Sequence, residues 1–310
     1  EFGHSLGLKH GHAAQAIFNT QITLPALPAD RDSNEFSVMT YRSFVGGPVN
    51  GGVSPEAGGY AQTLMMYDIA ALQTLYGANF QTNATDTVYK FDATTGEMFI
   101  NGAGQGAPVA NRVFLTVWDG GGTDTYDFSN YTQDQAIDLR PGNWSLFSDV
   151  QRANLGALKD GDAPTYARGN VFNALQYQND ARSLIENAIG GSGNDTLAGG
   201  KGQDSLYGQD GSDTFVFDDA MPAAFDKVAD FETGIDHIQI SSLAFGLNGS
   251  TLDPSYFVQG TAAVDNHAEF VFDTVKFVLS WDPDGVGGVS QVKIAAFNTS
   301  TVSASDFLIV

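Results

Sequence analysis

The spacing of hydrophobic residues changes near residue 80, from helical before it to strand-like after it. In AQTLMMYDIAALQTLYG, Leu64, Ile69, Leu72 and Leu75 keep helical spacing, and Gly77 ends the pattern. Beyond it, short runs rich in Val, Phe, Tyr and Thr alternate with Gly, Asn and Asp, as strands alternate with turns. The pattern therefore predicts an α+β fold that is mainly β.

The predicted strands lie on both sides of a polar stretch. They fall within DTVYKFDA, RVFLTVW, TYDFSNY and AIDLR before it, and within DKVADFETGIDHIQI, AEFVFDTVKFVLSWDPDGVGGVSQVKIAAF and SASDFLIV after it. Residues 154–182 between them show no period, so we expect a surface loop there. DPDG at 282–285 resembles the start of an EF-hand loop, but Lys293 stands where that loop needs Glu, which favours a hairpin turn.

Residues 190–216 form an internal repeat of nine-residue copies. They read GGSGNDTLA, GGKGQDSLY and GQDGSDTFV, so Asp195, Asp204 and Asp213 recur at the same place in each copy. An apolar residue stands two places after each aspartate. Nonapeptides of this kind are typical of the calcium-binding β-helix of RTX proteins. A Gly- and Asp-rich linker is the alternative, but three copies in register argue against it.

Calcium requires more oxygen ligands than one such turn supplies. It takes about six to eight oxygens, so successive turns must stack, and turns two copies apart would share an ion. This pairs Asp195 with Asp213, and it places Asp204 on the other edge with Glu186. Gln209 replaces a glycine of the third copy, so that turn is expected to bind most weakly. The candidate calcium ligands of the repeat are Gly191, Gly193, Asp195, Gly200, Gly202, Asp204, Gly211 and Asp213.

The charge narrows the possible partners. The 310 residues include 36 acidic and 14 basic ones, for a net charge of −22. Nucleic acids and anionic membranes both attract basic surfaces, so we expect neither as a partner. No apolar run reaches the ~18 residues of a membrane span, so stable membrane insertion is not expected. The length suggests about two domains, and without cysteine there is no disulfide.

The chain opens with EFGHSLGLKH, in which a carboxylate and two imidazoles are closely spaced. Glu1 and His4 would lie one turn apart on a helix, and Gly7 would let the chain turn so that His10 returns toward the same point. Neutral imidazoles suit zinc, and a carboxylate beside the metal can act as a general base.

From the glutamate onward this stretch matches the metzincin motif H-E-x-x-H-x-x-G-x-x-H, which a Met-turn follows in that family. FSVMTYRSF, with Met39 and Tyr41, resembles the Met-turn. With the repeat and the terminal DFLIV, the chain resembles the C-terminal portion of a serralysin-type secreted metalloprotease. The resemblance implies the remainder of a metzincin catalytic domain over residues 1–80, followed by a parallel β-roll and β-sandwich calcium-binding domain over residues 81–310.

The resemblance also implies a role for each residue of the zinc site. Glu1 would be the catalytic general base that activates a zinc-bound water, and His4 and His10 would be zinc ligands. Met39 would form the floor beneath the metal. Tyr41 would be a fifth ligand in the resting state that swings away to stabilise the oxyanion. The first histidine of the motif would precede Glu1, so we expect this polypeptide alone to bind zinc poorly and to cleave little.

WDGGGTD resembles the first calcium loop of the same family. The resemblance places Glu186 near this loop, which competes with the pairing of Glu186 and Asp204. Asn83, Thr85 and Thr87 align with a family segment that donates mainly backbone oxygens. The loop ligands that the resemblance implies are Asp119, Gly121, Gly122 and Asp124.

The implied function is that of a secreted, extracellular zinc endopeptidase that hydrolyses proteins and peptides, with one catalytic zinc and several structural calcium ions. DFLIV resembles the signal of type I secretion systems, a small protein inhibitor is a further implied partner, and a monomer is expected. The charge supports coupled export and folding: low calcium inside the cell would leave the acidic repeat disordered, and millimolar calcium outside would fold it.

Two other interpretations stay open. The chain could be a non-enzymatic calcium-binding repeat module whose HxxGxxH is incidental, or a processed C-terminal piece that serves export and stability. His12 is expected to be solvated. Asp230 and Asp236 could bind calcium or cap turns, and the sequence does not decide between these roles.

Overall fold

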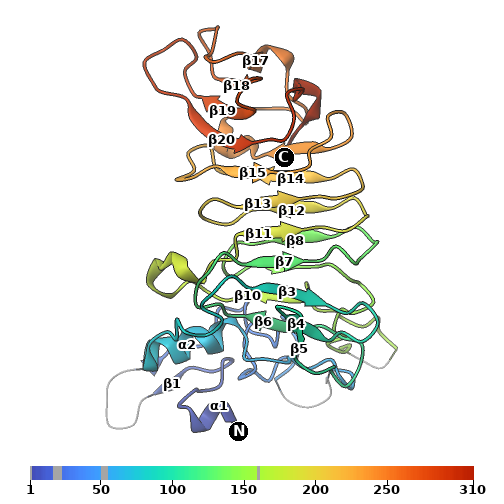
Figure 1. The fold of residues 1–310 in the computed structure, drawn as a ribbon. Coiled ribbons are helices and arrows are strands. Elements are labelled where there is room, and N and C mark those ends of the chain that lie inside the picture. The colour runs from blue at the N-terminus through green and yellow to red at the C-terminus, as the bar shows by residue number, and fades with distance from the viewer. Residues whose placement is uncertain (1, 17–22, 50–54, 159–160) are drawn as a thin grey trace. The chain divides into compact units, whose positions relative to one another are not determined.

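The computed structural model describes residues 2–16, 23–49, 55–158 and 161–310 of the chain (Figure 1). These residues divide into two compact units. The first comprises residues 1–122 and 141–183, and the second comprises residues 123–140 and 184–310. Short strands dominate the described residues, so the predicted mainly β fold is confirmed. The division near residue 80 that the sequence suggested stays a prediction.

The first unit contains two α-helices and several short strands. In chain order its elements are α1 (Phe2–Ser5), β1 (Gln15–Ala16), β2 (Thr23–Leu24), α2 (Met66–Tyr76), β3 (Val88–Phe91), β4 (Met98–Ile100), β5 (Ala103–Gly104), β6 (Leu115–Val117), β9 (Trp144–Ser145), β10 (Val171–Asn173) and the 3₁₀ turns Tyr177–Asn179 and Ala181–Ser183. β1 pairs with β2, and β3, β4 and β5 form an antiparallel meander. β10 lies between β6, parallel to it, and β9, antiparallel to it.

The predicted helix exists as α2, and the backbone N–H of Gly77 caps its end. Its buried residues are Met66, Asp68 and Gln73, whereas Leu75 is 56% exposed, so the apolar stripe inferred from the spacing is wrong. Polar side chains can replace apolar ones on a buried face when hydrogen bonds satisfy them. Asp68 is satisfied in this way, through bonds described below.

The polar stretch 154–182 is not a surface loop throughout, which corrects the sequence-based expectation. It contains β10, whose three residues are buried, and Ala167 and Asn170 are fully buried as well. Phe172 of β10 lies in the aromatic core with Phe36 and Phe114, at ring-centroid distances of 6.2 and 5.8 Å. A three-residue strand is too short to show a period in the sequence.

The second unit contains the repeat and the C-terminal strands. Its elements are β7 (Thr125–Asp127), β8 (Ala136–Asp138), β11 (Asn187–Ile189), β12 (Thr196–Ala198), β13 (Ser205–Tyr207), β14 (Thr214–Phe217), β15 (Asp226–Val228), β16 (His237–Ile240), α3 (Ser242–Phe245), β17 (Phe257–Gln259), β18 (Glu269–Asp273), β19 (Val278–Asp282), β20 (Val292–Ala296), β21 (Phe307–Ile309) and the 3₁₀ turns Pro254–Tyr256 and Ala304–Asp306.

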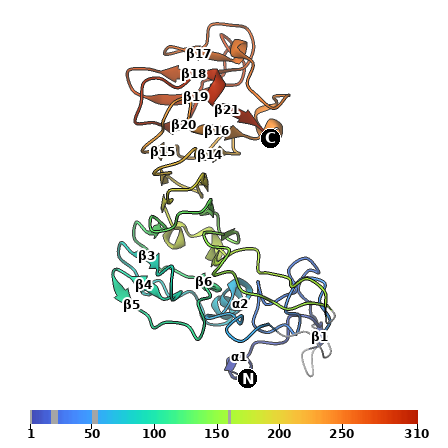
Figure 2. The ribbon, with the colours of Figure 1, turned by 90° about the vertical axis from the view of Figure 1, so that its right-hand side faces the viewer.

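The repeat strands alternate between two sheets, and within each sheet they pair in parallel (Figures 1 and 2). β11 pairs with β13 and β12 pairs with β14, each in parallel. The register partners Ala188 and Leu206, and likewise Leu197 and Phe215, stand two copies apart and are fully buried. The predicted stacking of turns two copies apart is therefore confirmed. The roll forms because each copy supplies one inward apolar side chain, which only the neighbouring turns can bury.

The C-terminal strands extend these sheets with antiparallel pairs. β20 continues the sheet beside β15, and β19 and β18 follow as antiparallel neighbours. β21 pairs in parallel with β16. Phe270 packs against Trp281 and Phe307, with ring centroids 4.6 and 4.9 Å away, and forms the local core. The DPDG segment begins the connection from β19 to β20, so the predicted hairpin turn is confirmed.

Candidate metal sites

The opening stretch of the first unit brings two histidines and a tyrosine together. His4 lies on α1, and Gly7 adopts a φ of +88°, a left-handed conformation that glycine accepts without strain. After this turn His10 returns beside His4, with ring centroids 4.5 Å apart. The Tyr41 hydroxyl lies 3.1 Å from Nε2 of His10. Three residues that the sequence proposed for one site thus lie together.

Backbone carbonyls orient both imidazoles. Nδ1 of His4 lies 2.9 Å from the carbonyl oxygen of Leu8, and Nδ1 of His10 lies 3.3 Å from that of Met39. A carbonyl oxygen only accepts, so a neutral ring bonded in this way carries its proton on Nδ1 and keeps the Nε2 lone pair. This arrangement is the common one around metal-binding histidines, and the donor set therefore fits zinc.

The Met-turn is anchored by a carboxylate that sequence reasoning missed. Asp68 of α2 accepts hydrogen bonds from the hydroxyl of Ser37 at 2.6 Å and from the backbone N–H groups of Val38 at 2.7 Å and Met65 at 3.0 Å. Burial raises the pKa of Asp68, and these bonds oppose the increase. The sequence signal was an aspartate in the first turn of a helix, a common capping position. Asp68 thereby fixes the turn that carries Met39.

Met39 is buried directly against α1. A Cβ added to Gly3 would lie 2.3 Å from the sulfur of Met39, so only glycine fits there without displacing the methionine. Glu1, the proposed general base, lies outside the described residues. The close contact between Gly3 and Met39 explains why glycine stands directly before His4.

A cavity of about 320 Å³ lies beside Tyr41. It is lined by residues of the Met-turn and of the segment before α2, namely Asn34, Val38, Thr40, Tyr41, Ser43, Pro55, Tyr60 and Ala61. Tyr41 and Tyr60 are each 57% exposed, so two aromatic rings border the cavity and face solvent. Its lining is mostly uncharged, which suits an apolar or uncharged polar group.

His12 packs against the same cluster but is held differently. Its ring centroid lies 5.3 Å from that of His10 and 4.8 Å from that of Tyr41. Its Nδ1 is buried and has no hydrogen-bond partner among the described residues, although His12 as a whole is only half-buried, so the expectation of a solvated side chain stays a prediction. Burial lowers the pKa of His12, with smaller effects from neighbouring charges. Within the described ranges, no carbonyl forms a hydrogen bond with the ring of His12 as carbonyls do with the rings of His4 and His10.

The first unit also holds part of the proposed first calcium loop. Asp119 is buried, and it accepts bonds from the N–H of Gly121 at 2.8 Å and from the Tyr89 hydroxyl at 2.7 Å. Gly122 follows with a φ of +146°. In the preceding segment the Asn83 side chain donates to the Tyr89 hydroxyl at 2.9 Å, and the Thr87 hydroxyl donates to the Thr85 carbonyl at 2.7 Å.

In the second unit Glu186 lies against Asp124. The N–H of Asp124 donates to Oε2 of Glu186 at 2.7 Å. The carboxylate that lies against Asp204 is instead Asp226, whose Oδ1 accepts from the Asp204 N–H at 3.0 Å. Glu186 therefore lies beside Asp124 of the proposed first calcium loop. It also precedes β11 as Asp204 precedes β13, and its carbonyl accepts from the Ser205 N–H at 2.8 Å, so the predicted stacking of Glu186 on Asp204 is present as well. Which of the two calcium sites Glu186 serves stays a prediction.

Carboxylates form a ladder along the other edge of the roll. The Gln135 N–H donates to Asp195, the Asp195 N–H to Asp213, and the Asp213 N–H to Asp236, at 2.8, 2.8 and 2.9 Å. Asp230 accepts from the N–H groups of Gly208 and Gln209. Each carboxylate is therefore held by backbone donors of the neighbouring turn. Asp195 stacks on Asp213 as predicted, and that the two share a calcium ion stays a prediction.

The repeat carboxylates are buried, and burial raises their pKa values. Burial raises the pKa of Asp195 to about 6 and of Asp213 to about 7, and burial with the charge of Asp226 raises the pKa of Asp204 to about 7. Oδ1 of Asp204 and Oδ2 of Asp213 are buried and have no hydrogen-bond partner among the described residues. Oxygens with lone pairs and no donor suit a hard cation such as calcium.

The repeat glycines place the backbone close to neighbouring turns. A Cβ on Gly191 would lie 2.1 Å from the carbonyl oxygen of Tyr131, and Gly211 has a φ of +137°. The remaining proposed glycine ligands are buried Gly193, half-buried Gly200 and exposed Gly202. No three His, Asp or Glu side chains lie together as a ready metal cage in the described part of the chain, so any calcium site here relies on backbone oxygens as well.

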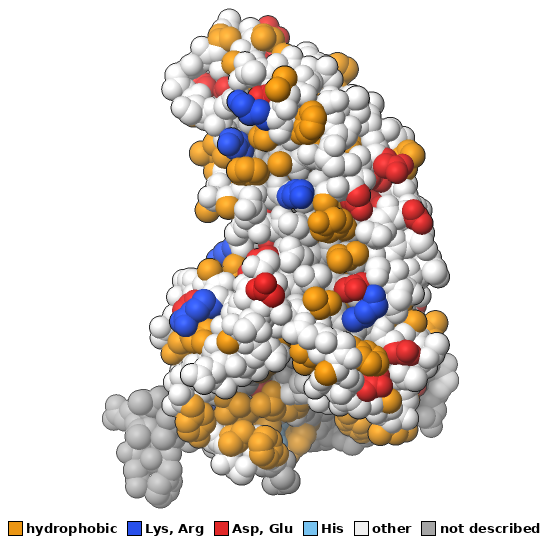
Figure 3. Space-filling model, viewed as in Figure 1, with side chains coloured by type: hydrophobic (Ala, Val, Ile, Leu, Met, Phe, Trp, Pro, Cys, Tyr) orange, Lys and Arg blue, Asp and Glu red, His pale blue; other side chains and the backbone are white. Residues whose placement is uncertain are grey.

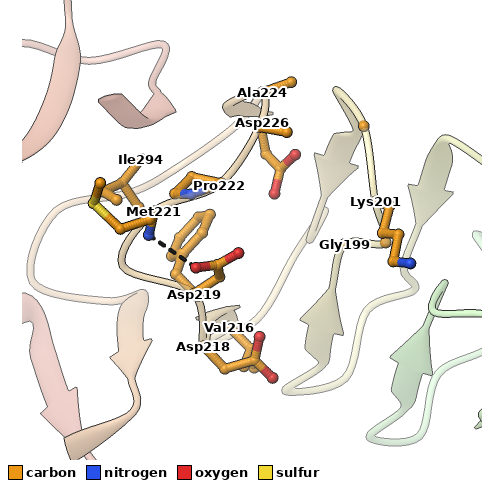
Figure 4. A pocket seen from close by; sticks show the side chains of 14 residues that line it. Gly199, Lys201, Val216, Asp218, Asp219, Met221, Pro222, Ala224, Asp226 and Ile294 are labelled. Atoms are coloured by element: carbon orange, nitrogen blue, oxygen red, sulfur yellow. Dashed lines mark hydrogen bonds between the residues drawn. The ribbon is translucent and has the colours of Figure 1, made fainter. Parts of the chain in front are cut away.

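Asp226 escaped the sequence analysis because an insertion precedes it. In the register of β13 and β15, Leu206 faces Val228, four residues beyond the regular repeat. The inserted loop borders a cavity of about 320 Å³, with Lys201 across it (Figure 4). Asp219 is turned back onto the loop, where it accepts from the Met221 N–H at 2.8 Å (Figure 4). Only the spacing from Asp204 hid this ligand candidate.

Comparisons with known proteins agree with this arrangement. The model of the peptidase M10 serralysin C-terminal family matches residues 78–308. The chain belongs to this serralysin family. It is 39% identical over 270 residues to metallopeptidase AprA of Pseudomonas marginalis. The aligned residues make up 79% of this chain and 50% of that protein. It is also similar to serralysin B of Dickeya chrysanthemi, at 38% identity over 78% of this chain and 48% of that protein, and to serralysin of Proteus mirabilis, at 38% over 78% and 49%.

The serralysin-family chain spans about half the length of these relatives. Among the described residues, none of the helices has the length and apolar composition needed to cross a bilayer. On the face shown in Figure 3, exposed acidic side chains are scattered among apolar and uncharged ones. Asp195, Asp204 and Asp213 are at most 1% exposed, so part of the negative charge is carried inside the roll.

Proposed function

We propose that this chain forms part of a zinc-dependent endopeptidase that acts on proteins outside the cell and whose repeat domain is folded by calcium. One observation carries the proposal: His4 and His10 lie side by side with each Nδ1 on a backbone carbonyl. Nε2 of His4, and Nε2 of His10 once the Tyr41 hydroxyl leaves it, would then bind one metal ion. The similarity to proteins named metallopeptidase and serralysin supports the same activity.

His4 and His10 would hold the zinc through Nε2. A bound zinc would supply Lewis-acid polarisation of a peptide carbonyl. Met39 supports the helix of His4 from below through its contact at Gly3, and Asp68 fixes the turn that carries Met39. These contacts keep the imidazoles oriented before any ligand arrives, which lowers the cost of binding.

Tyr41 is the residue of this cluster that can move. It is 57% exposed, and its hydroxyl donates to Nε2 of His10, because Nδ1 carries the ring proton. When another group takes that lone pair, the hydroxyl is released and can donate to the oxygen on which negative charge develops. The cavity beside Tyr41 would receive a neighbouring substrate side chain. Glu1 would act as the general base.

The repeat domain would bind calcium at both edges of the roll. The carboxylate ladder and the buried oxygens of Asp204 and Asp213 support this role. Since calcium binds the folded roll and not the unfolded chain, its binding energy adds to folding. The proposal also includes export through a type I secretion apparatus before folding, and an extracellular location. The exported protein would be a monomer, and a small protein would inhibit it.

Hydrolysis of casein by the protein as its gene encodes it, together with its zinc content, tests this function. We expect one zinc per molecule and activity that His10→Ala abolishes. His12→Ala is the matched control and should keep both zinc and activity, because His12 lies in the same cluster but no carbonyl of the described residues orients its ring. A protein that binds calcium but neither zinc nor casein would instead be the non-enzymatic calcium module.

A further inference from the structure

Two exposed asparagine–glycine pairs differ in how firmly the asparagine side chain is held. Asn101–Gly102 joins β4 to β5, and Asn248–Gly249 follows α3. In such a pair the backbone nitrogen of glycine can attack the side-chain amide carbon of asparagine, because glycine has no Cβ that hinders the approach. The reaction requires that the side chain leave its hydrogen bonds and turn toward that nitrogen. The surroundings of each pair therefore decide which one reacts.

The side chain of Asn101 is held at both ends. Its Oδ1 accepts from the Val88 N–H at 2.8 Å, and its Nδ2 donates to the Asp86 carbonyl at 3.3 Å. The Asn101 backbone N–H also donates to the Val88 carbonyl at 2.9 Å. Asn101 and Gly102 have φ values of +49° and +78°, as the two central residues of a tight hairpin turn require. Attack on this amide would break bonds that fasten the turn to β3.

The side chain of Asn248 is not held in this way. Neither this side chain nor the Gly249 N–H forms a hydrogen bond among the residues that the structure describes. A Cβ added to Gly249 would come no closer than 3.6 Å to the Thr251 carbonyl oxygen, so the space around the pair is open. Leu247 and Leu252 are 7% and 5% exposed and anchor the two ends of this short loop. The reacting groups of Asn248 and Gly249 are thus exposed and unrestrained between fixed ends.

The same loop contacts the C-terminal strand. The Ser250 carbonyl accepts from the Ile309 N–H at 3.0 Å, and Thr251 forms an antiparallel bridge with Leu308. The other edge of β21 pairs with β16. An isoaspartate at residue 248 would route the backbone through the side chain and lengthen it by one carbon, two residues before Ser250. Such a change would move the Ser250 carbonyl away from β21.

We propose that Asn248 is a site of spontaneous deamidation, and that the reaction loosens its loop from β21. The Gly249 nitrogen gives its proton to hydroxide and bonds to the side-chain amide carbon of Asn248, and the amide nitrogen leaves as ammonia. One water molecule then opens the five-membered ring to aspartate or to isoaspartate. The reaction needs no oxidant and no enzyme. It goes beyond the proposed protease function and does not depend on zinc.

Peptide mapping by mass spectrometry tests the site in the protein as its gene encodes it, incubated at pH 8 with millimolar calcium. We expect Asn248 to convert to the acid at least about tenfold faster than Asn101, because two hydrogen bonds of Asn101 must open first. The map separates both from Asn50–Gly51, which lies outside the described residues. In urea Asn101 and Asn248 should react at similar rates, which assigns the difference to the fold. Equal rates in the folded protein, or an Asn248 that stays unchanged, would overturn the proposal.

Hydrogen exchange at the Ile309 amide tests the effect on β21. It should be faster in the incubated wild type than in the fresh protein. Asn248→Gln keeps an exposed amide but closes its ring slowly, so its exchange should not change on incubation. Freshly prepared Asn248→Asp adds the charge without lengthening the backbone, and it should exchange at Ile309 as the fresh wild type does. If converted wild type exchanges at Ile309 no faster than incubated Asn248→Gln, the modification does not loosen β21.

Discussion

The histidine cluster of the first unit and the carboxylate ladder of the second unit are organised in opposite ways. His4 and His10 are imidazoles that backbone carbonyls hold in place through Nδ1. Asp195 and Asp213 of the ladder are buried acids whose pKa values are raised by burial first and by neighbouring carboxylates second. We therefore expect the first site to be organised before a metal binds and the second to need calcium for its stability. Metal removal, mutation and pH should therefore affect the two regions differently.

Removal of calcium should have the largest effect on stability, and the loss should be confined to the second unit. At free calcium a thousandfold above its Kd, each site contributes about 4 kcal/mol to folding, and this is lost in EGTA. We expect amide hydrogen exchange in β12–β14 to become fast, while exchange in the Ser37–Tyr41 turn changes little. Slow exchange in β12–β14 without calcium would remove the distinction between the two regions.

Asp68→Ala should destabilise the first unit, which carries the histidine cluster, and leave the repeat of the second unit intact. The substitution leaves the Ser37 hydroxyl and the N–H groups of Val38 and Met65 without their acceptor. We expect a loss of about 3 kcal/mol from the first unit in urea denaturation, since buried donors without partners cost about 1–3 kcal/mol each. Thr74→Ala on the exposed side of the same helix is the control and should cost under about 0.5 kcal/mol. Equal losses from both variants would mean that Asp68 does not anchor the Met-turn.

The sequence anticipated this part of the site only in outline. Glu1, His4, Gly7 and His10 form a linear motif, so their spacing alone indicated a metal site. Asp68 acts through hydrogen bonds across thirty residues, which no local spacing reveals. Its burial on α2 is also why the hydrophobic stripe of that helix was assigned wrongly: the helix packs by satisfied polar groups as well as by apolar ones.

The repeat was more predictable because its information is local and repeated. The nine-residue period gave the stacking of Leu197 on Phe215 and of Asp195 on Asp213. The prediction was incomplete where the period was broken: the four-residue insertion before β15 concealed Asp226, which lies against Asp204. β10 was missed for a related reason, since three residues carry too little pattern.

The dependence of stability on pH should reverse when calcium is removed. In the calcium-free folded state the pKa of Asp204 and of Asp213 is about 7, against about 3.9 for an unfolded aspartate. Between those values the folded state binds more protons than the unfolded state, so stability falls as the pH rises. In EGTA we expect the Tm of the second unit to be about 5 °C higher at pH 5.5 than at pH 8.

Calcium should invert this order, because protons compete with it for the same oxygens. With millimolar calcium the Tm should therefore be higher at pH 8 than at pH 5.5. Differential scanning calorimetry with and without EGTA measures both trends in one protein. A Tm that rises with pH in EGTA would show that burial does not raise the pKa of these carboxylates in the folded state. The contrast between the two metal regions would then be lost.

The smallest expected effect concerns the one copy that breaks the glycine pattern. Gln209 has a φ of +75°, a left-handed conformation that costs a residue with a side chain about 1 kcal/mol and costs glycine nothing. Its N–H donates to Asp230 at 2.9 Å, and glycine would keep that bond. We therefore expect Gln209→Gly to stabilise the calcium-loaded second unit by about 0.5–1 kcal/mol in urea denaturation. Gln203→Gly is the matched control: its φ is not positive, so glycine there only adds freedom to the unfolded chain and should destabilise. If both substitutions destabilise equally, the strain at residue 209 does not limit the repeat, and the third turn should bind calcium as well as the others.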